Sequence, residues 1–174
     1  KKYKSPIILI GSLKLLKSEM NLFSFKKKIN ILDLENIKKI KLKKNIINLI
    51  DINYDINHKN KKNLKKKIFY IEECFKVAFK LINIGLTYKL INGPISKKKF
   101  LKKRYLGVTE YVSHNFKIKN NAMLIYNKNL SVCPLTTHLP IKFVTKKINK
   151  KLIYEKIYLI NNFYKKFIKI KPKI

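Results

Sequence analysis

Apolar residues follow two spacings along the chain, and these spacings predict alternating strands and helices. Short apolar runs at residues 6–10 and 29–32, and a weaker one at 45–52, are typical of buried strands. Apolar residues recur at steps of three and four over 64–84 and again over 150–168, which predicts two helices. Strands interleaved with helices indicate an α/β layer fold with a mostly parallel or mixed sheet.

Further strands are expected in the second half of the pattern. Residues 88–91 predict a strand that runs into an Asn-Gly-Pro turn at 92–94. Residues 122–126 and 130–133 predict a hairpin or two adjacent strands, and 168–174 resemble the approach to another strand. Because the chain has neither an internal repeat nor a low-complexity linker, we expect a single α/β unit over residues 1–174.

Two turns offer candidate chemistry, INGPISK (91–97) and TTHLP (136–140), and each follows a predicted strand and precedes a helix. Ligands of open α/β sheets bind outside the carboxyl ends of the strands. Gly93 lets a ligand approach the backbone, and Ser96 can begin a short helix whose N–H groups favour an anion. His138 can bind a metal or transfer a proton. Glycine turns and lone histidines are more often structural, so each motif alone leaves both interpretations open.

The net charge of +33 raises the question of a nucleic-acid partner. Arg104 is the single arginine among 42 basic residues, although arginine is the residue that reads phosphate and guanine in a bidentate manner. The lysines spread along the whole chain, as AT-rich codons would produce. This pattern favours a solvated lysine surface, with a lysine-rich nucleic-acid-binding protein as the alternative class.

The cysteines and the hydropathy pattern exclude other classes. Cys74 and Cys133 lie far apart and form no Cys-x-x-Cys motif, so we expect two unpaired thiols in a reducing compartment. No run of 18 apolar residues occurs, which argues against a membrane partner. The expected location is the cytoplasm.

Four motifs in one order carry a family resemblance: LINGPISK (90–97), GVTEY (107–111), AMLIY (122–126) and LSVCPLTTHLPI (130–141). A glycine-proline turn followed by lysine, a Gly-His-Thr-Glu motif, an apolar strand and a Thr-Thr-His-hydrophobic-Pro motif occur at matching intervals in one family. The chain resembles that family, 4-hydroxythreonine-4-phosphate dehydrogenase of vitamin B6 biosynthesis. The match is best over residues 88–145.

The resemblance implies a three-layer α/β/α fold of the isocitrate and isopropylmalate dehydrogenase type, present here in part. It also implies a homodimer whose active site draws on both subunits. The implied activity is NAD- or NADP-dependent oxidation of 4-phosphooxy-L-threonine, with decarboxylation to 3-amino-2-oxopropyl phosphate, for pyridoxal 5'-phosphate synthesis. A related dehydrogenase of phosphorylated threonate or erythronate is the alternative within the class.

The resemblance also implies a divalent metal held by three histidines, with zinc, cobalt, manganese or magnesium as candidates. His138 matches the first of these metal ligands. Thr136 and Thr137 are expected to position the turn or to hydrogen-bond the ring. A cation at this site would lower the pKa of the substrate alcohol.

The family's histidine-threonine pair, which contacts the substrate, is only half present. Thr109 matches the threonine, but Val108 stands at the histidine position and cannot donate a hydrogen bond. The contact is therefore dispensable here, replaced by another group, or lost with some activity. His114 is a candidate replacement or a surface residue, and His58 is expected in a solvated loop.

We expect the chain to be roughly the first half of the enzyme without its beginning. The family's glycine-rich opening segment precedes the first strand seen here, and its second and third metal histidines lie in later motifs. Catalytic and cofactor-binding positions are also expected in that later part, so none is assigned here. Alone, the chain is expected to be inactive.

Overall fold

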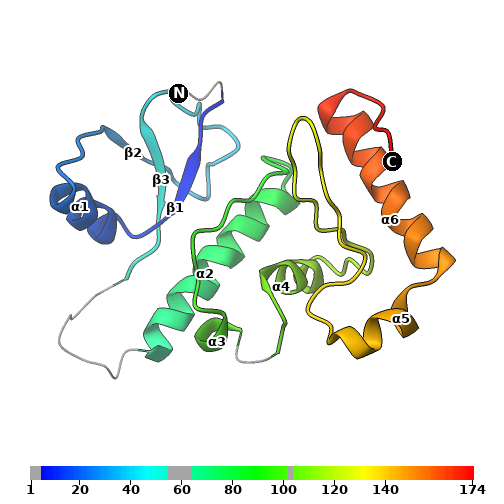
Figure 1. Cartoon of the computed structure of the whole chain (residues 1–174). Coiled ribbons are helices and arrows are strands. Elements are labelled where there is room, and N and C mark those ends of the chain that lie inside the picture. Colours follow the sequence, from blue (N-terminus) through cyan, green and yellow to red (C-terminus); the bar gives the residue numbers. More distant parts are fainter. Residues whose placement is uncertain (1–4, 55–63, 102–103) are drawn as a thin grey trace. The chain divides into compact units, whose positions relative to one another are not determined.

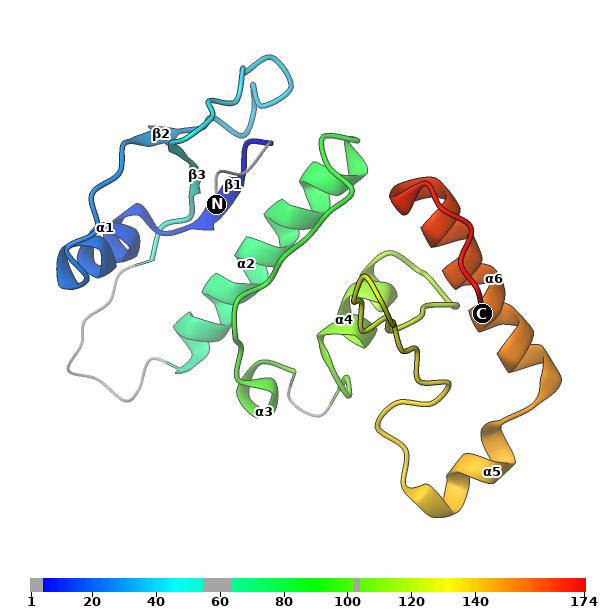
Figure 2. The ribbon, with the colours of Figure 1, turned by 45° about the horizontal axis from the view of Figure 1, so that its top comes forward.

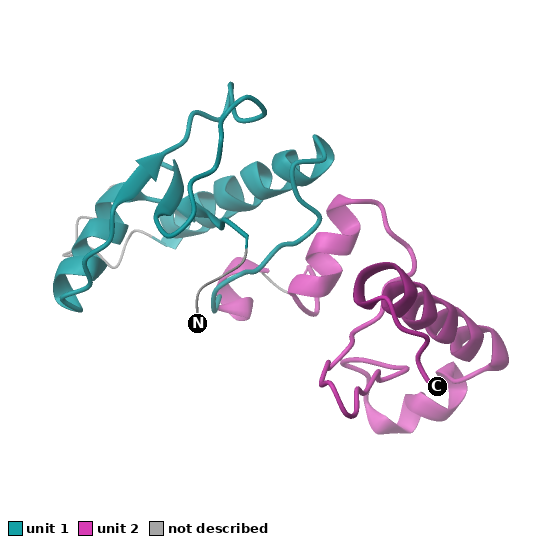
Figure 3. Cartoon of the chain, turned by 90° about the horizontal axis from the view of Figure 1, so that it is seen from above, with its two compact units in different colours: residues 1–95 teal, residues 96–174 magenta. Residues whose placement is uncertain are grey.

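The computed structural model describes residues 5–54, 64–101 and 104–174 of the chain. These residues belong to two compact units, residues 1–95 and residues 96–174 (Figure 3). Each unit is described by itself below, and the expected single unit over residues 1–174 stays a prediction.

The first unit is built on a parallel sheet of three strands, β1 (Ile8–Gly11), β2 (Ile29–Ile31) and β3 (Ile47–Asp51) (Figure 1). The strand order is β1-β3-β2, so the chain crosses over β3 between the first two strands. Both pairings are parallel. The three strands predicted from short apolar runs are therefore confirmed, together with the α/β class.

Two helices complete this unit, α1 (Leu13–Leu22) and α2 (Leu64–Asn83). The predicted helix over 64–84 is thus confirmed. The hydrophobic core joins the sheet, the loop after β2 and α2 through four buried side chains: Leu32, Ile37, Ile50 and Leu81. Burying each such side chain stabilises the fold by about 1.5–3 kcal/mol.

Gly85 ends α2 as the sequence predicts. Its backbone φ is 75°, in the left-handed region that favours glycine. The Gly85 N–H donates to the Ile82 carbonyl at 2.9 Å, and the Leu86 N–H donates to the Leu81 carbonyl at 3.1 Å, which is a Schellman motif. The chain then runs back alongside α2 (Figure 2).

The predicted strand at 88–91 is wrong. These residues pair with no strand of the described chain, and Tyr88 and Ile91 are 78% and 90% exposed. An apolar run becomes a strand only when its N–H and C=O groups find a neighbouring strand. The predicted approach to a strand at 168–174 likewise ends without strand structure.

The second unit is mainly helical. Its helices are α3 (Lys97–Phe100), α4 (Val108–Asn115), the short 3-10 turn η2 (Ile141–Phe143), α5 (Val144–Lys147) and α6 (Lys150–Phe163), which continues as the π-helical turn η3 (Tyr164–Ile168). The predicted helix over 150–168 is confirmed. Ser96 stands at the N-cap of α3, although its side chain makes no capping hydrogen bond.

The predicted strand pair at 122–126 and 130–133 is present only in part. A single antiparallel bridge joins Ile125 to Val132 through two backbone hydrogen bonds of 2.8 and 3.0 Å. The hairpin pairing is therefore correct, but neither segment forms a named strand. Ile125 and Val132 are 61% and 52% exposed, so no packed layer extends the bridge into a sheet.

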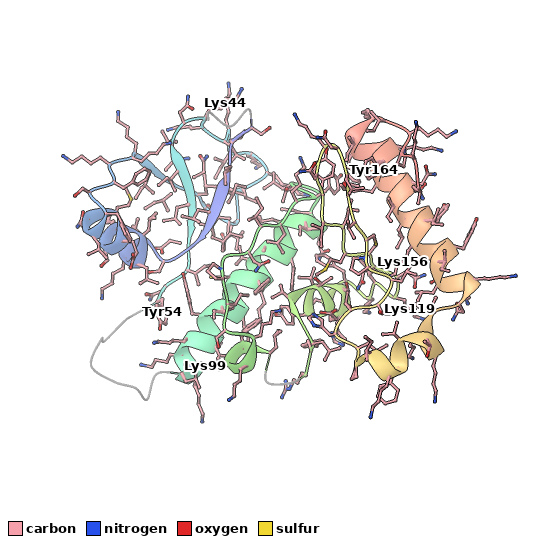
Figure 4. The ribbon with its side chains drawn as sticks, in the orientation of Figure 1. Lys44, Tyr54, Lys99, Lys119, Lys156 and Tyr164 are labelled. Atoms are coloured by element: carbon pink, nitrogen blue, oxygen red, sulfur yellow. The ribbon has the colours of Figure 1, made fainter. Side chains whose placement is uncertain are left out.

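The lysines lie on the surface of both units. Every lysine in the described part of the chain is exposed except Lys156 of α6, whose ammonium group donates to the Asn121 carbonyl (Figure 4). Both cysteines are free and half-buried, and burial raises the pKa of the Cys74 thiol. These observations fit a solvated lysine surface and structural thiols.

Tyr70 links α2 to the start of α1. Its hydroxyl oxygen accepts a hydrogen bond from the Ser12 backbone N–H at 2.9 Å, and its ring stacks on Tyr54 with 4.6 Å between centroids. Burial raises the pKa of the Tyr70 hydroxyl to about 12. The folded state therefore disfavours the charged phenolate.

We predict that Tyr70→Phe lowers the free energy of unfolding near neutral pH by about 1 kcal/mol, because the Ser12 N–H loses its acceptor. The Tyr70 pKa is raised on folding, so its contribution is complete below the ordinary tyrosine pKa of about 10 and declines as the pH rises further. Denaturant titrations of both proteins across this alkaline range should show the difference shrinking and then reversing in sign as the pH approaches 12, the folded-state pKa. A difference that stays constant over that range would contradict the assignment.

Candidate functional site

The GVTEY motif forms the start of α4. Gly107 is the N-cap in an extended conformation, without a side-chain cap, and Val108, Thr109 and Glu110 make up the first turn. Thr109 is exposed and Val108 is half-buried. The Thr109 hydroxyl is therefore accessible to a ligand, at a helix start whose backbone N–H groups receive no capping side chain.

His138 lies in the turn between Val132 and η2. Its backbone φ is 55°, a left-handed value that histidine adopts more readily than most residues but that still carries strain. His138 is exposed. Of the strand predicted at 130–133, which precedes this turn, only the bridge at Val132 is present.

The structure brings the two motifs together beside Gly107. A Cβ atom placed on Gly107 would lie 3.6 Å from His138 Nε2 and 2.7 Å from Glu110 Oε2. The His138 ring therefore sits against the first turn of the helix that carries Val108 and Thr109. The family resemblance implied that these motifs belong to one site, and the folded second unit places them side by side.

Glu110 is a residue that the sequence analysis missed. Its Oε2 atom is buried and has no hydrogen-bond partner within the described residues. Buried polar atoms are nearly always hydrogen-bonded, so such an atom calls for an explanation. The available signal was its place in GVTEY, directly after the threonine that matches the family motif.

The other histidines occupy different surroundings. His114 is in the last turn of α4 and is exposed, and its Nδ1 lies 3.0 Å from the Tyr105 hydroxyl. Six residues of helix separate it from Val108, which corresponds to about 9 Å along the axis. His114 therefore does not stand in for the missing histidine at position 108. His58 lies outside the described residues.

The glycine-proline turn belongs to the first unit. A Cβ atom on Gly93 would meet no atom within 4 Å, and its backbone φ is not left-handed. Packing within the described chain thus does not require glycine at this position. The proposed close approach of a ligand to Gly93 stays a prediction.

The His138 imidazole beside Gly107 offers a nitrogen donor, which suits a borderline divalent cation such as zinc or cobalt. Across residues 5–54, 64–101 and 104–174, no group of three or more histidine, cysteine, aspartate or glutamate residues gathers to hold a metal. Within the described residues, His138 is therefore a candidate for one ligand of a metal site.

We predict that Gly107→Ala destabilises the protein by no more than about 1 kcal/mol, because the added methyl group meets only the far end of the flexible Glu110 side chain, which can turn away. The contact at fault is the 2.7 Å approach to Glu110 Oε2, since the extended backbone at residue 107 accepts alanine. Gly93→Ala is the matched control, because its methyl group meets nothing within 4 Å. A loss much larger than about 1 kcal/mol relative to Gly93→Ala would show that the Glu110 side chain cannot turn away.

The sheet and the helices that follow it define a protein of the α/β class. The chain belongs to the family described as pyridoxal phosphate biosynthetic protein PdxA, whose family model matches residues 2–174. The resemblance drawn from the four motifs is thereby confirmed.

Relatives with known names support this placement. The chain is 35% identical over 158 residues to a 4-hydroxythreonine-4-phosphate dehydrogenase of Sulfurihydrogenibium sp. (strain YO3AOP1), covering 85% of this chain and 48% of that protein. It is 33% identical over 94 residues to the enzyme of the same name from Aquifex aeolicus (strain VF5), covering 52% of this chain and 29% of that protein. The chain spans about half the length of the Sulfurihydrogenibium relative.

Solved structures confirm the fold class. The structure of a putative 4-hydroxythreonine-4-phosphate dehydrogenase from Salmonella typhimurium matches with a TM-score of 0.75 at 20% identity, over 92% of this chain and 51% of that one. The enzyme from Klebsiella pneumoniae matches with a TM-score of 0.76 at 19% identity, over 92% and 50%. The chain thus has part of the α/β fold of these enzymes. In the described residues, no helix is both long and apolar enough to cross a bilayer.

Proposed function

We propose that this chain contributes the first part of an NAD- or NADP-dependent dehydrogenase that oxidises 4-phosphooxy-L-threonine in pyridoxal 5'-phosphate synthesis. The observation that carries the proposal is the meeting of His138 with the GVTEY turn beside Gly107. Family membership supplies the reaction class. Phosphorylated threonate or erythronate is the alternative substrate.

His138 is the proposed ligand of a divalent metal. A divalent cation, when bound, supplies Lewis acidity that lowers the pKa of a substrate alcohol and stabilises negative charge. The exposed imidazole can offer a nitrogen lone pair to a metal. Imidazole favours zinc, cobalt or manganese over magnesium.

Thr109 is the proposed substrate contact on α4. Its hydroxyl both donates and accepts, and it is exposed in the first turn of the helix. Val108 offers no such group. In this turn only Thr109 can therefore hydrogen-bond the substrate through its side chain, whereas the family motif has both a histidine and a threonine for this contact. We therefore propose that Val108 weakens substrate binding or turnover.

We propose that the remaining parts of the enzyme correspond to the segment of the relatives that this chain does not match. These parts include the other metal ligands, the catalytic residues and the cofactor-binding residues. A homodimer whose active site uses both subunits, in the cytoplasm, completes the proposal.

The proposal is tested by joining this chain to the remaining half of the Sulfurihydrogenibium relative. NADH formation is followed with 4-phosphooxy-L-threonine after a chelator and after zinc, cobalt, manganese or magnesium is added back. The joined protein should oxidise the substrate only with metal, and this chain alone should not. Oxidation of the threonate or erythronate phosphate instead would select the alternative, and failure with all three substrates would reject the proposal.

A further inference from the structure

We infer that Glu110 is a positioning residue for His138. Its carboxylate accepts the Nε2–H of the imidazole, which fixes the ring and leaves Nδ1 as the nitrogen that faces a metal. The inference rests on the proposed metal role of His138 and names the group that orients the ring. The family resemblance had suggested Thr136 and Thr137 for that task.

The local role expected of Glu110 does not account for its buried oxygen. An acidic residue in the first turn of a helix usually faces the uncapped backbone N–H groups, where the helix dipole favours a negative charge. Glu110 Oε2 instead accepts no hydrogen bond within the described residues and is shielded from water. A carboxylate oxygen in such a place is costly unless a donor reaches it.

His138 is the donor that the geometry offers. Apart from Gly107 and its chain neighbours, Glu110 and His138 supply the atoms nearest to the empty Cβ position of Gly107. Glu110 Oε2 and His138 Nε2 both lie within 3.6 Å of that position. The two atoms are not hydrogen-bonded in the structure, but no side chain on Gly107 stands between them, and the inferred bond forms when the two side chains turn toward each other.

The described structure shows no hydrogen bond from the His138 imidazole to Thr136, Thr137 or Glu110, so the choice among these partners rests on their chemistry. A carboxylate is the stronger acceptor for an imidazole N–H. Metal-binding histidines commonly donate their second ring nitrogen to a carboxylate, which sets the tautomer and the ring orientation.

The test reads the tautomer of His138 in the chain itself, without metal, cofactor or substrate. The ring nitrogen and carbon shifts are measured by NMR at about pH 9, where an ordinary imidazole is neutral. The wild-type ring should be a single tautomer with the proton on Nε2. In Glu110→Ala it should relax toward the mixture of tautomers that an exposed, unpaired imidazole shows.

Two further variants keep the test decisive. Glu110→Gln should retain most of the wild-type tautomer, because its amide oxygen still accepts a hydrogen bond. Gly107→Ala should mimic Glu110→Ala, because its methyl group displaces Glu110 Oε2. The His114 ring, held by Tyr105, is the internal control and should not change. Backbone amide spectra verify that each variant is folded.

Identical His138 tautomers in wild type, Glu110→Ala and Gly107→Ala would overturn the inference. That result would leave the metal role of His138 untouched, since no metal enters the measurement. Conversely, a tautomer that depends on Glu110 would stand even if the proposed dehydrogenase activity were rejected. The two proposals thus fail separately.

Discussion

His138→Ala is expected to abolish metal-dependent NAD reduction in the protein that joins this chain to the remaining half of the Sulfurihydrogenibium relative. Loss of a metal ligand should lower activity by more than the roughly 10- to 100-fold that follows loss of the residue that hydrogen-bonds the ligand. The fold should survive, because the His138 side chain is exposed and contributes little to the core. Alanine at its left-handed backbone adds a strain of about 1–2 kcal/mol.

His114→Ala is the matched control for this variant. His114 is an exposed histidine of the same unit, and it faces Tyr105 at the far end of α4. Turnover of the His114 variant should stay near the wild-type value, with unchanged metal dependence. If His138→Ala kept near-normal turnover while folded, the assignment of His138 to the metal would be wrong.

Val108→His is expected to raise kcat/KM by about ten- to a hundredfold, since a hydrogen bond to a charged group contributes about 1.5–3 kcal/mol. The half-buried side chain at position 108 lies in the first turn of α4, next to Thr109 and close to the His138 ring. A histidine there restores the donor that the family motif has. The effect should appear in KM, in kcat, or in both, depending on whether the contact strengthens in the transition state.

Val108→Leu separates the hydrogen bond from the change in side-chain size. It enlarges the side chain without adding a donor, so kcat/KM should not rise. A histidine variant no better than the leucine variant would mean that the site has adapted to an apolar residue at this position. Thr109→Val should lower kcat/KM in the same assay, because it removes the remaining hydroxyl of the turn.

The elements that the sequence predicted correctly are those whose signal is local. The stripes of α2 and α6 repeat over many residues, and Gly85 ends α2 through its own backbone preference. Strand β3 gave a weak signal because Asn48 interrupts its apolar run. In the fold Asn48 is fully buried, and its amide is satisfied by hydrogen bonds to Ile7, Asn30 and Lys43, which no spacing rule reveals.

The wrong strand prediction at 88–91 has a physical cause. These residues have strand-like composition, yet a strand also needs a hydrogen-bonded neighbour, and composition carries no information about that neighbour. Residues 122–133 show the intermediate case, in which a correct pairing at Ile125 and Val132 does not extend.

The part of the candidate site that lies in the family motifs could be predicted from the sequence. The order of GVTEY and TTHLP in the family indicated one site, and the structure places His138 against the turn that contains Thr109. Glu110 escaped prediction because an acidic residue in a first helical turn has an ordinary local explanation. Glu110 and His138 are 28 positions apart in the sequence, and only the tertiary structure brings both of them to Gly107.

The central claim, that His138 binds the metal of a dehydrogenase, is tested most directly by anomalous X-ray diffraction. Crystals of the joined protein grown with zinc or cobalt would be measured at the absorption edge of that metal. The account predicts an anomalous peak about 2.0–2.1 Å from a ring nitrogen of His138. The coordination positions of this metal that no protein ligand occupies should face Thr109. A metal peak bound elsewhere, with His138 uncoordinated, would contradict the account.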